Sequence, residues 1–306
     1  MSAPSSGRDR RNFCCSALIA GMLLSATIGC GAPRIATTGA TRRIVSLAPS
    51  VTETLFALGA GAEVVGVSQY CDYPPQARRL PRIGTFVTPN IEAIVALRPT
   101  LVIGLLTSSD LRQIRALQAM GITTLMVDDG SVAAIEASIE KIGEAVGRQN
   151  AARDLVGQIR SRLSGIKQRL AAVRPRRVLM VVGHQPLVAV GAGNYLDELL
   201  GLADARNIAD FSAQSWPRLS LEYIVASRPE VILDGQMGTD PHAPARFWAR
   251  YPSIPAVRER RVFGYPDDPT LHPGPRVPQT LELLARRIHP EAFAADLQPV
   301  SDRAQQ

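Results

Sequence analysis

The chain has 306 residues, of which 46% are hydrophobic and 20% are charged, and its formal net charge is +7. This length and composition exclude a disordered or fibrous protein and are sufficient for two domains. The arginines are scattered, with no basic run interleaved with aromatic residues, so we expect no nucleic-acid partner.

The first 41 residues have the pattern of an export leader followed by a linker. Basic residues, including Arg10-Arg11, precede an apolar run over 13–28, which matches the charged and hydrophobic regions of a signal peptide. The run ends at Gly29-Cys30, which resembles a lipobox and makes Cys30 the candidate lipidation site. Ordinary cleavage within 31–41 is the alternative, and both the general and the twin-arginine export routes stay open. We expect a periplasmic protein or a membrane-anchored extracytoplasmic lipoprotein.

A pattern that occurs twice organises the rest of the chain. Residues 90–104 read N-I-E-A-I-V-A-L-R-P-T-L-V-I-G, and residues 220–234 read S-L-E-Y-I-V-A-S-R-P-E-V-I-L-D. Each copy has a capping residue, an acid, a short helix, an Arg-Pro stop and a β-branched strand. Glu92 and Glu222 occupy the same place in the two copies, 130 residues apart. The duplication predicts two similar α/β lobes, each with its own parallel sheet.

The first lobe should bind ligands at the carboxyl edge of its sheet. The strand at 64–67 runs into S-Q-Y-C-D-Y-P-P, where Tyr70 stands at the edge that α/β sheets use for ligands. Ser50 followed by Glu53 reads as a capping box, which explains Glu53 without a functional role. We expect further strands at 44–47, 101–105 and 123–127, and helices from Ser50 and over 110–119 and 131–146.

A long helix should join the two lobes. Leu155, Ile159 and Leu163 recur at the spacing of one helical face, and Asn150 can cap the helix. A helix from Ala151 to Ala172 would be roughly 33 Å long. Because bending it would break backbone hydrogen bonds, we expect a rigid connection with limited hinge opening.

The second lobe repeats the order of the first. A strand over 178–182 leads to His184, and Trp216 precedes the second copy of the repeated unit. We expect a helix at 194–201, a strand at 261–264 and a helix over 278–288. The predicted parts are the leader and linker (1–41), the first lobe (42–148), the interlobe helix (149–174), the second lobe (175–290) and a tail that frays (291–306).

Three segments carry a resemblance to a known family. They are S-L-A-P-S-V-T-E-T-L-F-A-L-G-A-G at 46–61, V-V-G-V-S-Q-Y-C-D-Y-P-P at 64–75 and I-E-A-I-V-A-L-R-P at 91–99. The chain from 42 to about 290 resembles the helical-backbone class of substrate-binding proteins of ABC importers, and the loop at 68–75 is most similar to its cobalamin-binding branch. The resemblance implies two Rossmann-like lobes joined by one helix, with the ligand in a cleft between them.

The resemblance also implies a function and a set of partners. The ligand would be cobalamin or a related corrinoid, delivered to the permease of an ABC transporter; haem or a ferric siderophore is the alternative. Glu92 and Glu222 match the acids that dock each lobe on the permease, although the helix dipole alone also favours an acid in a first turn. The implied ligand contacts are Tyr70 and Trp216 as ring-stacking faces, Phe86 in place of a tryptophan, Asp268 toward the amide rim, His272 in place of an arginine, and His184 toward the cleft.

The histidines leave an alternative open, and enzymatic motifs are absent from the sequence. His184 and His272 can donate hydrogen bonds, ligate cobalt or iron, or be ordinary structural residues. The chain has no G-x-S-x-G elbow, no phosphate-binding glycine-lysine loop and no H-E-x-x-H motif. We therefore expect a monomeric binding protein rather than an enzyme, with no cofactor and no resident metal, in which a corrinoid is the transported ligand.

Overall fold

The structure is a computed structural model, and it describes residues 42–85, 87–106, 111–235, 240 and 242–297. Phe86 and Cys30 lie outside the described residues. Within the described ranges, no helix is both long enough and apolar enough to cross a bilayer. From Ala40 onward the chain forms one compact unit.

The first lobe is built on a parallel sheet of four strands. These are β1 (Ile44–Ser46), β2 (Val64–Val67), β3 (Leu101–Leu105) and β4 (Thr123–Val127), in the order β2-β1-β3-β4. All three pairings are parallel. The central strands β1 and β3 are buried along their whole length, as expected for a parallel sheet covered on both faces. The strand positions predicted from the sequence are confirmed to within one residue.

The helices of the first lobe are α1 (Pro49–Ala57), α2 (Ile91–Ala96), α3 (Leu111–Ala119) and α4 (Val132–Ala145), with single-turn helices η1 (Gly61–Glu63) and η2 (Pro75–Arg79). The predicted capping box at Ser50 is wrong. The N-cap of α1 is Ala48, which makes no side-chain cap bond, and Pro49 occupies the first turn. Proline is favoured at the first helical position because its φ is already helical and because it has no N–H that would be left unpaired there. Glu53 is therefore left for another role.

The second lobe is built on a sheet of five strands. These are β5 (Arg176–His184), β6 (Leu187–Ala189), β7 (Ala205–Asn207), β8 (Val231–Asp234) and β9 (Val262–Gly264). The order is β6-β5-β8-β9. Both β6 and β7 pair with the same edge of β5: β7 pairs with the start of β5, and β6 pairs with the end of β5. The second sheet is parallel, as predicted, in its β5–β7, β5–β8 and β8–β9 pairs, and the β5–β6 pair at its edge is antiparallel. A two-residue turn at Gln185-Pro186 allows this hairpin, whereas a parallel neighbour would need a crossover.

The helices of the second lobe are α6 (Tyr195–Leu202), α7 (Leu221–Ser227), α8 (Ala243–Trp248), α9 (Pro255–Arg258), α10 (Asp267–Thr270) and α11 (Val277–Ile288). A short helix η3 (Pro290–Leu297) follows. The prediction that the tail over 291–306 frays is wrong for the part that forms this helix. Phe293 is buried, and the Asp296 carboxylate accepts hydrogen bonds from Arg169 at 2.7 Å and Arg286 at 2.9 Å.

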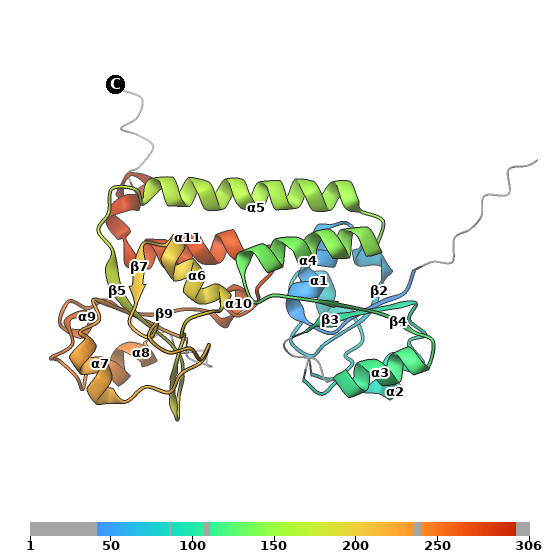
Figure 1. The fold of residues 1–306 in the computed structure, drawn as a ribbon, viewed down its shortest axis with the longest axis horizontal. Coiled ribbons are helices and arrows are strands. Elements are labelled where there is room, and N and C mark those ends of the chain that lie inside the picture. The colour runs from blue at the N-terminus through green and yellow to red at the C-terminus, as the bar shows by residue number, and fades with distance from the viewer. Residues whose placement is uncertain (1–41, 86, 107–110, 236–239, 241, 298–306) are drawn as a thin grey trace, which may run out of the picture. The chain divides into compact units, whose positions relative to one another are not determined.

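The connecting helix is α5 (Gln149–Arg169), which packs against α4 of the first lobe and α11 of the second (Figure 1). Its buried residues Val156, Ile159, Leu163 and Ile166 follow the predicted spacing. The N-cap is Arg148 rather than the predicted Asn150, whose amide oxygen instead accepts a hydrogen bond from Arg153. The buried side chains of α4, α5, α6 and α11 form one continuous cluster. The two lobes therefore share a core along α5.

Candidate functional site

The repeated unit folds in the same way in both lobes. The Asn90 side chain accepts a hydrogen bond from Ala93 N at 3.0 Å at the start of α2, and Ser220 accepts one from Tyr223 N at 3.2 Å at the start of α7. Both helices then stop at an arginine in the left-handed conformation, with φ of 46° at Arg98 and 50° at Arg228. Each stop is followed by a buried proline, at positions 99 and 229, and by a central strand.

An arginine from the neighbouring strand region secures each of these helix ends. Arg43 Nε donates to the carbonyl of Leu97 at 3.0 Å, and Arg177 Nε donates to the carbonyl of Arg228 at 3.1 Å. Such bonds satisfy carbonyls that the last turn of a helix leaves without partners. The duplication read from the sequence is therefore a structural duplication.

The acids of the repeat are exposed and lie on different lobes. Glu92 is in the first turn of α2, and Glu222 is in the first turn of α7. The backbone N–H of Glu222 and the Ser220 hydroxyl hold the pKa of the Glu222 carboxyl below its usual value. An exposed carboxylate in a first turn stays ionised and is available to a cationic partner.

Two large rings stand exposed on loops that hydrogen bonds to their backbone carbonyls hold in place. Tyr70, 47% exposed, follows β2, where Arg82 donates to the carbonyls of Ser68 and Cys71 at 3.0 Å. Trp216, 46% exposed, follows Ser215, whose carbonyl accepts from the backbone N–H of Gly191 at 2.9 Å and from Asn194 Nδ2 at 3.0 Å. The Trp216 segment runs beside β6, and therefore near the carboxyl end of β5.

A buried cluster of charges joins the two lobes. Arg276, which precedes α11, donates through Nε to Glu53 of α1 at 2.7 Å. The same guanidinium pairs with Asp268 and lies over the Tyr73 ring, 4.1 Å from its centroid. His272 Nδ1 is 3.3 Å from the Asp268 carboxylate and 3.8 Å from that of Glu53. The sequence places Asp268 and His272 in a common site, but it does not reveal Glu53 or Arg276.

The electrostatics of this cluster follow from its burial. Burial raises the pKa of the Glu53 carboxyl, and the bonds from Arg276 oppose that rise. Burial also opposes the charge on Arg276, but its bonds to Glu53 and Asp268 outweigh this effect and raise its pKa. Glu53, Asp268 and His272 are close enough to share a metal ion. However, Arg276 already supplies the positive charge that these carboxylates need, so we assign no metal to them.

One sequence feature could have pointed to Glu53. It is the only charged residue between 44 and 62, a stretch that is otherwise apolar or small. A single charge in such a stretch is seldom buried unless it is paired.

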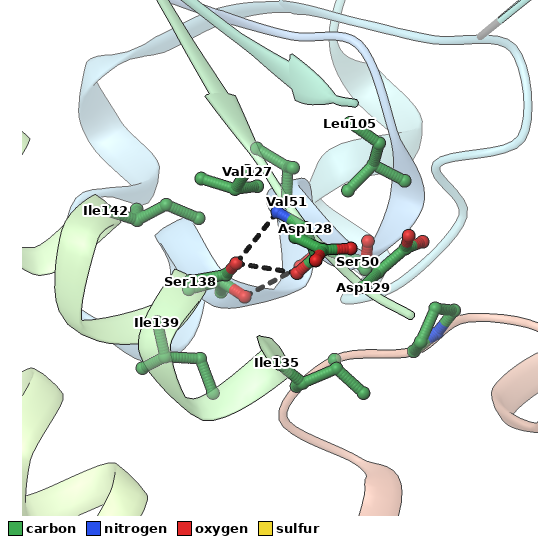
Figure 2. Close-up of a pocket in the computed structure, with 13 residues that line it drawn as sticks. Ser50, Val51, Leu105, Val127, Asp128, Asp129, Ile135, Ser138, Ile139 and Ile142 are labelled. Carbon is green, nitrogen blue, oxygen red and sulfur yellow. Dashed lines mark hydrogen bonds between the residues drawn. The ribbon is translucent and has the colours of Figure 1, made fainter. Parts of the chain in front are cut away.

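Two hollows of different size lie near the junction of the lobes. A groove of about 420 Å³ is lined by residues of α1, α5 and the segment before α11, and includes Tyr73 and Arg276. A second pocket, of about 10 Å³, lies between the end of β4 and α4, where Ser138 Oγ accepts from Asp128 N at 3.1 Å and donates to Asp128 O at 2.6 Å (Figure 2). The smaller pocket has room for no more than a single water molecule.

His184 lies where the sequence predicts it, at the end of β5. Its Nε2 is 2.9 Å from the Asp234 carboxylate at the end of β8, the adjacent parallel strand. Its ring remains partly exposed at the carboxyl edge of the sheet. The structure thus brings Asp268 and His272 together in the charge cluster and places His184 on the second sheet beside a carboxylate that sequence reasoning missed.

Known proteins are similar to this chain in sequence and fold. Residues 44–269 match the model of the family described as periplasmic binding protein. A protein of Photorhabdus laumondii subsp. laumondii named vitamin B12-binding protein is 28% identical over 247 residues, which cover 81% of this chain and 88% of that relative.

Two solved structures show the same two-lobed arrangement. The periplasmic vitamin B12 binding protein BtuF of Vibrio cholerae is 28% identical with a TM-score of 0.72, and the match covers 84% of this chain and 98% of that one. The periplasmic heme-binding protein RhuT from Roseiflexus sp. RS-1, in apo form, is 28% identical with a TM-score of 0.76, covering 83% of this chain and 100% of that one. Solved proteins whose names give different ligands, vitamin B12 and heme, therefore have the same sequence identity to this chain.

Proposed function

The chain belongs to the periplasmic binding protein family, and from that premise we propose that it captures a corrinoid, cobalamin or a close analogue, and delivers it to the permease of an ABC importer. Members of this family bind and release their ligands without chemical change, so the protein is a binding protein and not an enzyme. The proposal places it in the periplasm, held at the membrane if Cys30 carries a lipid.

The observation that carries the corrinoid proposal is the pair of exposed rings on the two lobes. Tyr70 and Trp216 stand at the carboxyl ends of the two sheets, the edge at which α/β sheets bind ligands. Stacking a broad planar ring between two aromatic faces buries a large apolar area at little cost in side-chain entropy. The relative named vitamin B12-binding protein, matched over 88% of its length, supports the same choice.

The remaining ligand contacts would be polar. Asp268 is half exposed, and its ion pair with Arg276 fixes its orientation, so it can accept hydrogen bonds from amide N–H groups on a corrinoid rim. His184 and His272 would complete the polar part of the site. The proposed ligand-binding residues are Tyr70, Phe86, His184, Trp216, Asp268 and His272, of which Phe86 lies outside the described residues.

A second candidate ligand is haem. The similarity to a heme-binding protein at the same 28% identity favours it, as do two histidines that can act as iron ligands. Haem carries carboxylates rather than amides at its rim. A half-exposed Asp268 would repel those carboxylates, which is why we place the corrinoid first.

Absorbance titrations of the purified protein with cyanocobalamin and with haemin test the proposal. We expect a saturable complex with one cyanocobalamin per chain, from which the ligand is recovered unchanged, and much weaker binding of haemin. Saturable binding of haemin without binding of cyanocobalamin would replace the corrinoid with the second candidate. Binding of neither compound would remove planar macrocycles from consideration.

A further inference from the structure

The imidazole of His184 is held in place from two sides. Its Nε2 lies 2.9 Å from Asp234 Oδ1, and the ring meets Phe247 edge to face with the centroids 4.2 Å apart. The side chain is nevertheless 21% exposed, so part of the ring reaches the surface at the end of β5. An immobilised histidine whose side chain is still partly exposed is arranged differently from a solvated loop histidine.

The carboxylate that holds His184 is itself fixed. Asp234 has no exposed surface, and its second oxygen, Oδ2, accepts a hydrogen bond from Trp248 Nε1 at 2.7 Å. Trp248 is fully buried beneath it. Because an indole nitrogen can only donate, this carboxylate acts as an acceptor. A buried carboxylate costs free energy unless its oxygens are satisfied, and here both are.

This arrangement determines the tautomer of His184. Since Asp234 accepts, the proton between the two residues belongs to Nε2 of the imidazole, and in neutral His184 the lone pair is on Nδ1. Among the described residues, Nδ1 has no recorded hydrogen-bond partner. A histidine that donates one N–H to a carboxylate and presents the other nitrogen has the form of a metal-ligating histidine, whose basicity the carboxylate increases.

We propose that His184 Nδ1 is an axial ligand to the central metal of the transported macrocycle, and that Asp234 is the positioning residue that orients it. The proposal rests on the proposed function, because it requires a metal-containing planar ligand between the lobes. The chemical class is a tetrapyrrole whose metal has an exchangeable axial position, occupied by water in the free ligand. The site would then prefer the aqua form of the macrocycle to a form whose axial position is blocked by a strong ligand such as cyanide.

The test compares the affinities of the protein for aquacobalamin and cyanocobalamin, and records the absorbance spectrum of each complex. We expect aquacobalamin to bind more tightly, with a spectral shift that reports replacement of water by imidazole. His184→Ala should abolish the shift and make the two affinities equal. Asp234→Asn should reduce the preference by about ten- to a hundredfold, since loss of a partner that orients a metal ligand has an effect of that size.

The ratio of the two affinities separates a positioning role from a structural one. A folding defect in the Asp234→Asn protein would lower both affinities together and leave their ratio unchanged, which would overturn the role of Asp234. His242→Ala, a change at an exposed histidine of the same lobe, should leave the ratio and the spectrum as in the unmodified protein. Loss of the shift in His272→Ala but not in His184→Ala would overturn the assignment of the ligand.

Failure of the inference can be distinguished from failure of the proposed function. If cyanocobalamin and aquacobalamin bind equally and without a spectral shift, the corrinoid proposal stands and the axial ligand does not. A parallel titration with haemin and its cyanide-blocked form covers the second candidate. A preference for the unblocked form in either series supports axial ligation and identifies the metal.

Discussion

Arg276 pairs with two carboxylates that come from different lobes. One guanidinium serves Glu53 of the first lobe, Asp268 of the second and the face of Tyr73. Arginine suits this position because its planar fork can bond to two acceptors and stack on an aromatic ring at the same time. A lysine there would supply the charge but not the geometry.

Replacing Glu53 with glutamine should destabilise the protein far more than a typical surface change. The substitution keeps the shape but leaves a buried guanidinium with one carboxylate instead of two. Breaking a buried ion pair on one side costs about 3–5 kcal/mol, and we expect the lower end, about 3 kcal/mol, because Asp268 still pairs with Arg276. Urea denaturation followed by circular dichroism measures the change in the free energy of unfolding.

Glu63→Gln is the matched control for this measurement. Glu63 also bonds to two arginines, Arg42 at 3.4 Å and Arg148 at 3.2 Å, but these arginine side chains are 38% and 42% exposed, against 10% for Arg276. Exposed pairs contribute about 0–1 kcal/mol, so the control should change stability by less than 1 kcal/mol. Equal losses in the two proteins would show that the interlobe cluster has no special stabilising role.

At the scale of elements, glycine has opposite roles in the two helices that pack along the junction. Gly143 of α4 is buried where α4 crosses α5, and a Cβ at this position would overlap the Cβ of Ala152. Gly157 and Gly165 of α5 are exposed, and a Cβ at either would meet no atom within 4 Å. Close approach requires the first glycine, whereas the other two only weaken their helix.

Alanine substitutions should therefore have opposite signs in α4 and α5. Gly157→Ala and Gly165→Ala should each raise the free energy of unfolding by about 0.5–1 kcal/mol, because alanine loses less backbone entropy in a helix. Gly143→Ala should lower it by about 1–3 kcal/mol, the usual cost of overpacking. Urea unfolding of the three variants checks this. A gain in stability at Gly143 would mean that α4 and α5 can separate without cost.

Patterns local in sequence predicted most of these elements. β-branched runs located the strands of the first lobe, and the three- and four-residue spacing located the buried face of α5. Capping residues marked the starts of α2 and α7. Each of these patterns spans about ten residues, so the helix or strand that it indicates can be predicted from the sequence alone.

Features that depend on residues distant in the sequence could not be predicted. Glu53 and Arg276 are 223 positions apart, and the sequence around each residue does not indicate that the two residues pair. Asp234 lies 50 positions from His184 and looks like an ordinary strand end. The tail residue Asp296 is held by Arg169, 127 positions away. The terminal position of this segment suggested fraying, whereas the fold supplies partners for it. Strand β6 has only three residues, too few for an alternating pattern.

At the scale of the whole molecule, the two lobes are joined by side-chain packing and an ion pair as well as by the connecting helix α5. The buried faces of α4, α5, α6 and α11 form a single cluster, and the Glu53–Arg276 pair adds a second link. Opening the lobes widely would expose this shared core to water. We therefore expect ligand capture to occur with small rearrangements, and the separation of Glu92 and Glu222 to stay nearly constant.

A nearly constant separation would suit Glu92 and Glu222 to the role that we propose for them, docking the two lobes on the permease together. Two exposed carboxylates, one on each lobe, can engage a two-sided receptor only if both reach their basic partners together. Reversing both charges, by Glu92→Lys with Glu222→Lys, should abolish uptake of a labelled corrinoid by reconstituted transporter. The affinity of the free protein for cyanocobalamin should remain within about twofold, because exposed substitutions rarely alter stability by more than 0.5 kcal/mol.

The double substitution Glu140→Lys with Glu144→Lys distinguishes docking from a general effect of charge. Both residues are exposed acids on α4, so the net charge changes by the same amount at a different place. Uptake should persist in this control, because long-range repulsion from a basic permease is screened over about 8–10 Å at physiological ionic strength whereas a direct ion pair is lost entirely. If the control also loses uptake, the total charge rather than the repeated acids governs delivery. If the first pair loses ligand binding instead, the acids support the fold and not the permease contact.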